Sequence, residues 1–208
     1  MKITKMTPSQ HVKDRWFAVL EDGTSLKLTV ALIADYGLFS GRELTDGELE
    51  ALRQDAGKTN AKERAARIVG ARPVSRKELV RRLMEKGENP ENAEEAAAAM
   101  ERIGAVNDEE YAAMIVRHYF AKGFGLGRVR DELYRRGVPK ELWEDALAEM
   151  PDTAETLDAL VAQKLRGRSA DKKELKKLTD TLCRRGFSWE EIRGALARYG
   201  EETEESAD

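Results

Sequence analysis

The chain has 208 residues and a formal net charge of −3, and 36% of its residues are charged while 41% are hydrophobic. The charged share exceeds the roughly 25% of an ordinary globular chain, but the apolar share suffices for packed cores. A lone cysteine excludes an internal disulfide, and two histidines are too few for a metal cluster, so we expect no metal site. No apolar run approaches the length of a membrane span and no signal-peptide pattern is present, so we expect a cytoplasmic protein without membrane contact.

The first 58 residues predict a small β-containing element. Two apolar runs, 15–20 and 25–30, flank the dipeptide Asp22-Gly23. Asp-Gly favours a two-residue hairpin turn in which both residues have positive φ, so we expect a β-hairpin here.

Two short helices are expected next. Thr45 and Glu48 cap a helix that ends near residue 56, and Asn60 and Glu63 cap another that ends near residue 69. Pro73 then breaks the chain before a further helix start. Residues 59–74 are therefore expected to connect the N-terminal element to the rest of the chain.

The rest of the chain repeats itself with a period of about 50 residues. Two apolar residues four apart and a glycine four further on recur three times: Leu79, Leu83 and Gly87; Val129, Leu133 and Gly137; Leu178, Leu182 and Gly186. The apolar residues lie on one helix face, and the glycine fits the left-handed position that ends the helix. A second helix follows each glycine, and a third, near 108–122 and 153–165, closes the first two copies. The repeats predict a mainly α fold, an elongated, curved array of three-helix repeats behind the N-terminal β-hairpin element.

This organisation divides the chain into six parts. They are the β-containing element 1–58, a connecting helix 59–74, helical repeats at 75–124, 125–168 and 169–200, the last of them truncated, and an acidic tail 201–208. The tail is poor in apolar residues, so we expect it to be disordered.

Two glycine-containing stretches resemble nucleotide-binding loops but lack the full pattern. In the run from Gly123 to Gly127, the third glycine of a dinucleotide fingerprint would fall on Arg128 or Arg130. In DAGKTN, residues 55–60, the first glycine of a phosphate-binding loop is replaced by Leu52. We recognise no nucleophile–base pair either, and therefore predict a protein that is not an enzyme and has no cofactor.

The near-neutral balance hides segregated charge. The first helix of each repeat is basic, whereas residues 141–158 contain seven acidic residues and no basic one. If the repeats stack in parallel, the basic helices form a positive surface for a polyanion or an acidic protein. The alternative is that these side chains are solvated and make only weak ion pairs. The candidate binding residues are Arg76, Lys77, Arg81, Arg82, Arg128, Arg130, Arg135, Arg136, Lys172, Lys173, Lys176 and Lys177.

Several segments, in this order, resemble the RecX family of RecA regulators. Arg72 and the following SRKEL at 75–79 are similar to the family's RxxSxxEL opening, and NDEEY at 107–111 is similar to the start of a later helix. Residues 125–137 resemble the signature of the second repeat, a glycine-containing turn followed by a basic helix. The similarity extends from about Arg64 to the end of the third repeat.

The resemblance implies a function without catalytic residues. RecX-like proteins bind along the groove of the RecA filament and restrain its ATP hydrolysis and strand exchange. The expected partner is therefore the RecA filament, with DNA contacted indirectly or weakly, and we expect a monomer. Two other functions stay open: a helix-turn-helix regulator that reads duplex DNA, and a small hydrolase or transferase. The acidic second helices argue against major-groove insertion, and the lack of a recognisable site argues against the enzyme.

Overall fold

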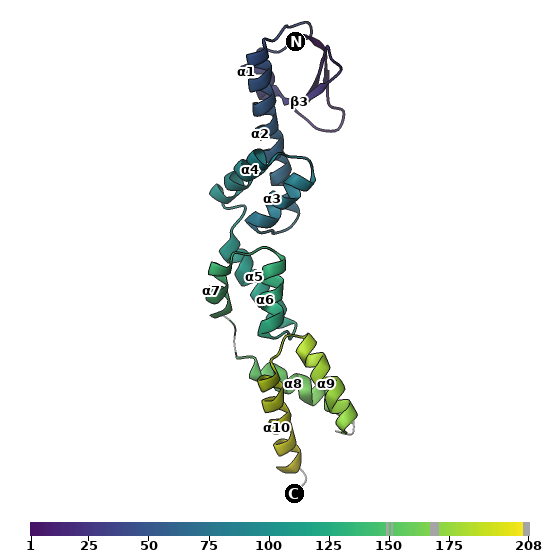
Figure 1. Ribbon diagram of the computed structural model, residues 1–208, viewed down its shortest axis with the longest axis vertical. Coiled ribbons are helices and arrows are strands. Elements are labelled where there is room, and N and C mark those ends of the chain that lie inside the picture. Colours follow the sequence, from purple (N-terminus) through teal and green to yellow (C-terminus); the bar gives the residue numbers. More distant parts are fainter. Residues whose placement is uncertain (149, 151, 167–170, 206–208) are drawn as a thin grey trace. The chain divides into compact units, whose positions relative to one another are not determined.

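The computed structural model describes residues 1–148, 150, 152–166 and 171–205 (Figure 1). The chain consists of two compact units, Met1–Val106 and Asn107–Asp208. The described part contains ten α-helices and one three-stranded antiparallel sheet. None of its helices is both long enough and apolar enough to cross a membrane. The prediction of a mainly α fold with helical repeats and a small N-terminal β-element is confirmed.

The N-terminal sheet has the strand order β1-β2-β3, with β1 at Ile3–Pro8, β2 at Arg15–Leu20 and β3 at Ser25–Thr29. Its apolar face packs against the short helix α1, Val30–Asp35, and the beginning of α2, Asp46–Ala71. The strand β1 and the helix α1 were not predicted. The strand ITKMTP alternates weakly, because only Ile3 of its residues is fully buried.

The predicted hairpin exists, but the prediction of its turn was wrong. The Leu20 amide donates to the Thr24 carbonyl oxygen at 2.8 Å, so the loop has three residues rather than two. Gly23 has φ +84°, whereas Asp22 is not among the described residues with positive φ. The Asp22 carboxylate instead accepts hydrogen bonds from the amide and hydroxyl of Thr24, which stabilises the longer loop.

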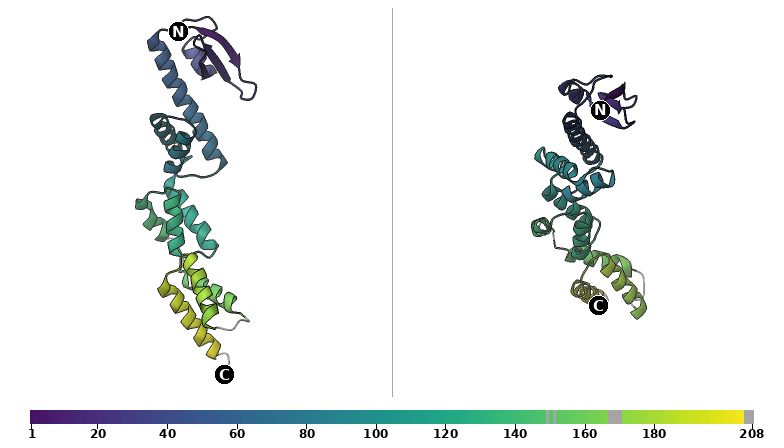
Figure 2. Two further views of the ribbon diagram at one scale, coloured as in Figure 1. Left: turned by 45° about the vertical axis from the view of Figure 1, so that its right-hand side comes forward. Right: turned by 45° about the horizontal axis from the view of Figure 1, so that its top comes forward.

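One continuous helix, α2, replaces the two short helices that the sequence predicted (Figure 2). The Thr45–Glu48 capping box is present, but Asn60 and Glu63 cap nothing. Asn60 donates to the Lys27 carbonyl oxygen at 3.1 Å, and Glu63 pairs with Arg15 of β2, so both residues fasten α2 to the sheet. The capping pattern was therefore misread because these polar side chains have tertiary partners.

The first helical group consists of the C-terminal half of α2 together with α3, Arg76–Glu85, and α4, Pro90–Arg102. Ser75 caps α3 by accepting the Glu78 amide at 3.0 Å. Gly87 ends this helix with φ +87°, as its place in the repeat predicted. The buried side chains of this group include Ala65, Ile68, Leu79, Leu83, Ala93, Ala97 and Met100.

The second unit holds two further helical groups with separate cores. One group comprises α5, Asp108–Ala121, α6, Leu126–Arg135, and α7, Trp143–Ala148, which follows a 3-10 turn. Its core contains Tyr111, Ala112, Ile115, Val116, Val129, Leu133, Val138 and Ala146.

The other group comprises α8, Ala154–Leu165, α9, Lys172–Arg184, and α10, Trp189–Glu205. Its core contains Leu157, Val161, Leu165, Leu178, Leu182, Phe187, Ile192 and Ala195. The helix α10 continues to Glu205, so the prediction that the tail is disordered was wrong for residues 201–205. Residues 206–208 lie outside the described residues.

The packing groups begin one helix earlier than the predicted repeats. The sequence placed the helix at 108–122 with the two helices before it, whereas α5 packs with α6 and α7. In the same way α8 packs with α9 and α10, so the last group has three helices. Repeated sequence shows which helices are alike, but not which faces they bury together. As limits of independently folding domains, the predicted ranges stay a prediction.

Candidate partner-binding surface

The basic residues predicted on α3 differ in how far carboxylates neutralise them. Arg76 reaches across to α4, where it lies 2.7 Å from Glu94 and 3.4 Å from Glu101. Arg81 pairs with Glu85 of its own helix at 2.5 Å, and both side chains are more than half exposed. Lys77 is exposed and has no ion pair within the described residues. Of these three, Lys77 presents the least compensated charge.

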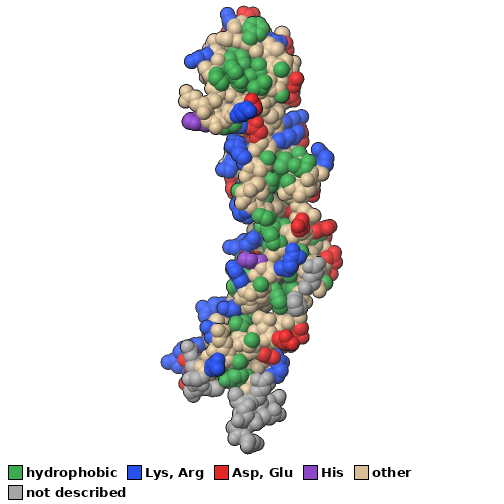
Figure 3. Space-filling view, turned by 180° about the vertical axis from the view of Figure 1, so that it is seen from behind, with side chains coloured by type: hydrophobic (Ala, Val, Ile, Leu, Met, Phe, Trp, Pro, Cys, Tyr) green, Lys and Arg blue, Asp and Glu red, His purple; other side chains and the backbone are tan. Residues whose placement is uncertain are grey.

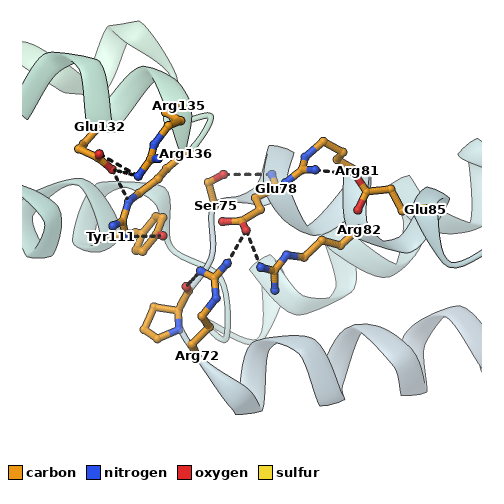
Figure 4. Close-up of polar contacts among 11 residues, drawn as sticks. Arg72, Ser75, Glu78, Arg81, Arg82, Glu85, Tyr111, Glu132, Arg135 and Arg136 are labelled. Atoms are coloured by element: carbon orange, nitrogen blue, oxygen red, sulfur yellow. Dashed lines mark hydrogen bonds and ion pairs between the residues drawn. The ribbon is translucent and has the colours of Figure 1, made fainter.

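Arg82, the fourth candidate on α3, takes part in the structure of the helix. It lies 2.9 Å from the Glu78 carboxylate, of which only 9% is exposed, and Arg72 donates to the same carboxylate at 2.6 Å (Figure 4). A buried carboxylate is costly unless it is paired. Arg82 therefore stabilises α3 by pairing with Glu78, whether or not a partner is bound.

Three of the four candidates at α6 surround one buried carboxylate, that of Glu132, which is 1% exposed. Arg128 and Arg136 lie 3.2 Å from it and Arg135 lies 2.8 Å from it, the last two as drawn in Figure 4. Burial opposes ionisation of this carboxyl, but hydrogen bonds from Arg135 and Arg136 outweigh it, so the pKa of Glu132 lies below its ordinary value. One negative charge thus holds three guanidinium groups together.

Two tyrosines of α5 hold Arg136 on the other side. Its guanidinium donates to the Tyr111 hydroxyl at 3.3 Å and to the Tyr119 hydroxyl at 3.5 Å, and it lies over the Tyr119 ring at 5.8 Å. Arg136 is therefore a packed residue that joins α5 to α6. By contrast, Arg135 has a side chain that is 69% exposed, and Arg130 is exposed without an ion pair in the described part of the chain. Arg130 and Arg135 are the α6 candidates available to a partner.

The basic helix α9 is the most exposed of the three. Lys172, Lys173 and Lys176 are exposed, and none of them has an ion pair among the described residues. Lys177 pairs with Glu174 at 2.6 Å. The helix contains five basic and two acidic residues, so it keeps a positive surface after its internal pairing.

A contact between glycines places α9 against α6. The Gly125 amide donates to the Arg185 carbonyl oxygen and the Gly127 amide donates to the Gly186 carbonyl oxygen, each at 2.9 Å. The Arg185 guanidinium donates to the Gly123 carbonyl oxygen at 3.2 Å and lies over the Phe124 ring at 5.6 Å. We call these two backbone hydrogen bonds and the Arg185 contacts the glycine junction.

The glycine junction brings the C-terminal end of α9 to the N-terminal end of α6. The predicted residues of these two helices thus belong to one unit, whereas those of α3 belong to the other. In the second unit, the lower part of Figure 3, Lys and Arg side chains gather along one edge and Asp and Glu side chains along the opposite edge. The two basic helices were predicted from the sequence, but the glycine junction and the contacts of Arg185 in it were not. No local signal could have paired positions about 60 residues apart.

These features define a class of protein that is built from consecutive three-helix groups. In two of these groups, a basic helix of one meets a basic helix of the other end to end. Two family models match the second unit. The second three-helix domain of RecX matches residues 107–147, and the third three-helix domain of RecX matches residues 152–196. The two matches correspond to the packing groups α5–α7 and α8–α10.

Comparisons with individual proteins agree with these matches. The regulatory protein RecX of Chromohalobacter salexigens is 32% identical over 140 residues, which cover 67% of this chain and 92% of that protein. The regulatory protein RecX of Listeria welshimeri is 24% identical over 200 residues, which cover 94% of this chain and 74% of that protein. The chain belongs to the RecX family.

Two solved structures share its fold. A crystal structure of regulatory protein RecX has a TM-score of 0.66 at 22% identity, and the match covers 93% of this chain and 98% of that chain. The crystal structure of RecX from Lactobacillus salivarius has a TM-score of 0.62 at 19% identity, covering 68% of this chain and 96% of that chain.

Proposed function

We propose that this protein is a non-catalytic regulator that binds the RecA filament and restrains its ATPase and strand-exchange activities in recombinational DNA repair. Its membership of a family whose members are named regulatory proteins supports a regulatory role. We further propose that it acts as a cytoplasmic monomer. The partner follows from the family resemblance of the sequence, and the surface that meets the partner follows from the charges of the second unit.

The main support for the proposed binding surface is the exposed positive charge of α9 and α6. Lys172, Lys173 and Lys176 on α9 and Arg130 on α6 are exposed and have no ion pair in the described part of the chain. Charges that are not compensated within a protein attract a partner of opposite sign and raise the rate of encounter. A filament of protein on DNA offers acidic side chains and phosphate groups.

Direct DNA binding is a secondary contribution in this proposal. Aromatic side chains do not alternate with the basic residues of α9, as they do on platforms that stack single-stranded bases. Tyr134, which is 71% exposed on α6, is the one aromatic residue of the described α6 and α9 helices. Backbone contacts from lysines would be weak and strongly dependent on salt.

A titration of RecA's DNA-dependent ATPase with this protein tests the proposal. We expect substoichiometric amounts to slow the ATPase of the RecA from the same organism. The charge reversal Lys172→Glu, Lys173→Glu and Lys176→Glu should weaken this inhibition while leaving the circular dichroism spectrum unchanged.

The matched control is the triple reversal Lys2→Glu, Lys5→Glu and Lys13→Glu, which makes the same change in net charge at exposed positions of the N-terminal element. Equal loss of inhibition in both triple variants would mean that net charge matters and the α9 surface does not. An unaltered ATPase with the wild-type protein would refute the proposed function. Sequence-specific protection of duplex DNA in a footprint would replace it with a DNA-reading function.

A further inference from the structure

The glycine junction satisfies the helix ends of α6 and α9 with each other. The first amides of a helix and the last carbonyl groups have no partners within that helix. At the start of α3 and α5, the side chains of Ser75 and Asn107 accept such an amide. Gly125, the N-cap residue of α6, has no side chain to do so. The carbonyl groups at the end of α9 take this place, since they accept the Gly125 and Gly127 amides.

This arrangement also aligns the two helix dipoles head to tail. The C-terminal end of α9 carries partial negative charge, and the N-terminal end of α6 carries partial positive charge. Their contact is therefore electrostatically favourable, in addition to the two backbone hydrogen bonds that cross it. It relies on backbone atoms, which no change of rotamer can move.

The close approach requires glycine on both sides. A Cβ atom at Gly125 would lie 2.6 Å from the carbonyl carbon and oxygen of Gly186. A Cβ atom at Gly186 would lie 2.1 Å from the Arg128 amide nitrogen, and this glycine has φ +90°. At Gly127 the nearest atom is 3.1 Å away, which is tight but less severe. The atoms in the way are backbone atoms, so a side chain at 125 or 186 must push the two helices apart.

We propose that Gly125, Gly127 and Gly186 are positioning residues that fix α9 relative to α6, so that the basic residues of both helices form one binding surface. The inference rests on the proposed function for its biological role, but the fixed arrangement itself is a property of the chain. The cores of the groups α5–α7 and α8–α10 are separate. A side chain at the junction should therefore change how the two groups are placed while each group remains folded.

A distance measurement on the full chain tests the arrangement. The single native cysteine, Cys183 on α9, is exposed, and Tyr134 on α6 is 71% exposed, so Tyr134→Cys yields a pair of spin-label sites with one substitution. We expect a narrow distribution of distances between the labels in the otherwise native protein. Gly125→Ala and Gly186→Ala should shift or broaden it, and Gly127→Ala should do so less.

Two control variants separate the contact from ordinary effects of replacing glycine. Gly87→Ala has the same backbone strain as Gly186→Ala, since Gly87 has φ +87°, but no atom lies within 4 Å of its added Cβ. Gly70→Ala places a methyl group at an exposed helical position that is equally open. Both should leave the distance distribution unchanged.

A second label pair reports whether the group itself stays folded. Met114→Cys on α5 and Tyr134→Cys on α6, with Cys183→Ser, place both labels within one packing group. This distance should be the same with and without alanine at 125 or 186. An unchanged α6–α9 distance in both Gly125→Ala and Gly186→Ala would overturn the proposal, and so would a change of equal size in the Gly87→Ala control.

The ATPase titration then tests the role of the junction. Loss of simultaneous contact by two linked surfaces lowers the apparent affinity steeply, so half-inhibition by Gly186→Ala should need about 100-fold more protein. An altered distance with full inhibition would overturn the positioning role. If the wild-type protein fails to inhibit RecA, the proposed function fails, and the distance measurements still decide whether the junction fixes the two helices.

Discussion

The helices α3 and α6 occupy equivalent places in the repeat, yet their buried ion pairs have opposite polarity. In α3, Glu78 lies near the helix start and pairs with Arg82 one turn later, at 2.9 Å. In α6, Arg128 lies near the start and pairs with Glu132 one turn later, at 3.2 Å. A carboxylate near the start of a helix and a cation near its end are stabilised by the dipole, so α3 has the favourable order and α6 the unfavourable one.

The surroundings of α6 compensate for its reversed order. Arg135 and Arg136 add two cations around Glu132, and the C-terminal carbonyl groups of α9 lie at the helix start near Arg128. Within the described residues, the pair on α3 has only Arg72 in addition. A buried charge in this chain is therefore stabilised by its neighbours, and these neighbours differ between α3 and α6.

Removing the buried carboxylate from each helix should give the largest difference in stability between α6 and α3 variants. Glu132→Ala leaves three guanidinium groups without their shared partner and should lower the free energy of unfolding by about 3–5 kcal/mol. Glu78→Ala should cost less, about 1–3 kcal/mol, because it leaves two guanidinium groups, those of Arg72 and Arg82, without their partner rather than three. Denaturant unfolding followed by circular dichroism measures both. A Glu78 variant as unstable as the Glu132 variant would contradict the comparison.

Replacing one arginine in each cluster should give a smaller difference. Arg136→Lys loses a planar group that reaches Glu132, Tyr111 and Tyr119 together, and should destabilise the protein by about 1 kcal/mol. Arg82→Lys on α3 keeps a cation near Glu78, so we expect a lower cost there. The same unfolding measurement checks both, and equal losses would show that the tyrosine contacts of Arg136 add nothing.

The dependence of stability on pH should give the smallest difference. The pKa of Glu132 is lowered in the folded protein, so its stabilising contribution is complete above the ordinary glutamate pKa of about 4.3. That contribution is lost as the pH falls through the lower pKa of the folded state. Melting temperatures between pH 3 and pH 7 should therefore fall less steeply on the acid side in Glu132→Gln than in the wild type. Parallel curves for the two proteins would refute this assignment.

Local signals correctly predicted several helix ends. The Thr45 and Ser75 caps, and the glycines at 87, 137 and 186 that end helices, follow from interactions within a few residues, and the structure contains them all. The repeat spacing likewise predicted which helices are equivalent. These features could be derived because each depends on neighbouring residues alone.

The partners of polar side chains could not be derived in this way. Glu78 and Glu132 look like ordinary exposed residues of charged helices, and their burial depends on where the arginines fold back. Asn60 looks like a helix cap until β3 supplies a carbonyl group. The predicted site residues therefore mixed exposed cations such as Lys173 with structural ones such as Arg136, since composition does not distinguish them.

The helix α2 has a consequence for any attempt to separate the N-terminal element from the helical groups. Its first half supplies Leu49, Leu52 and Ala56 to the core beneath the sheet, and its second half supplies Ala61 and Ala65 to the core with α3 and α4. Cutting the chain after residue 58 would divide one helix and expose apolar surface on both fragments. Local melting of the sheet should likewise loosen α3 and α4, because the two cores share one helix. The N-terminal element therefore stabilises the first helical group through α2. Its removal should destabilise α3 and α4 although no residue of these helices has been changed.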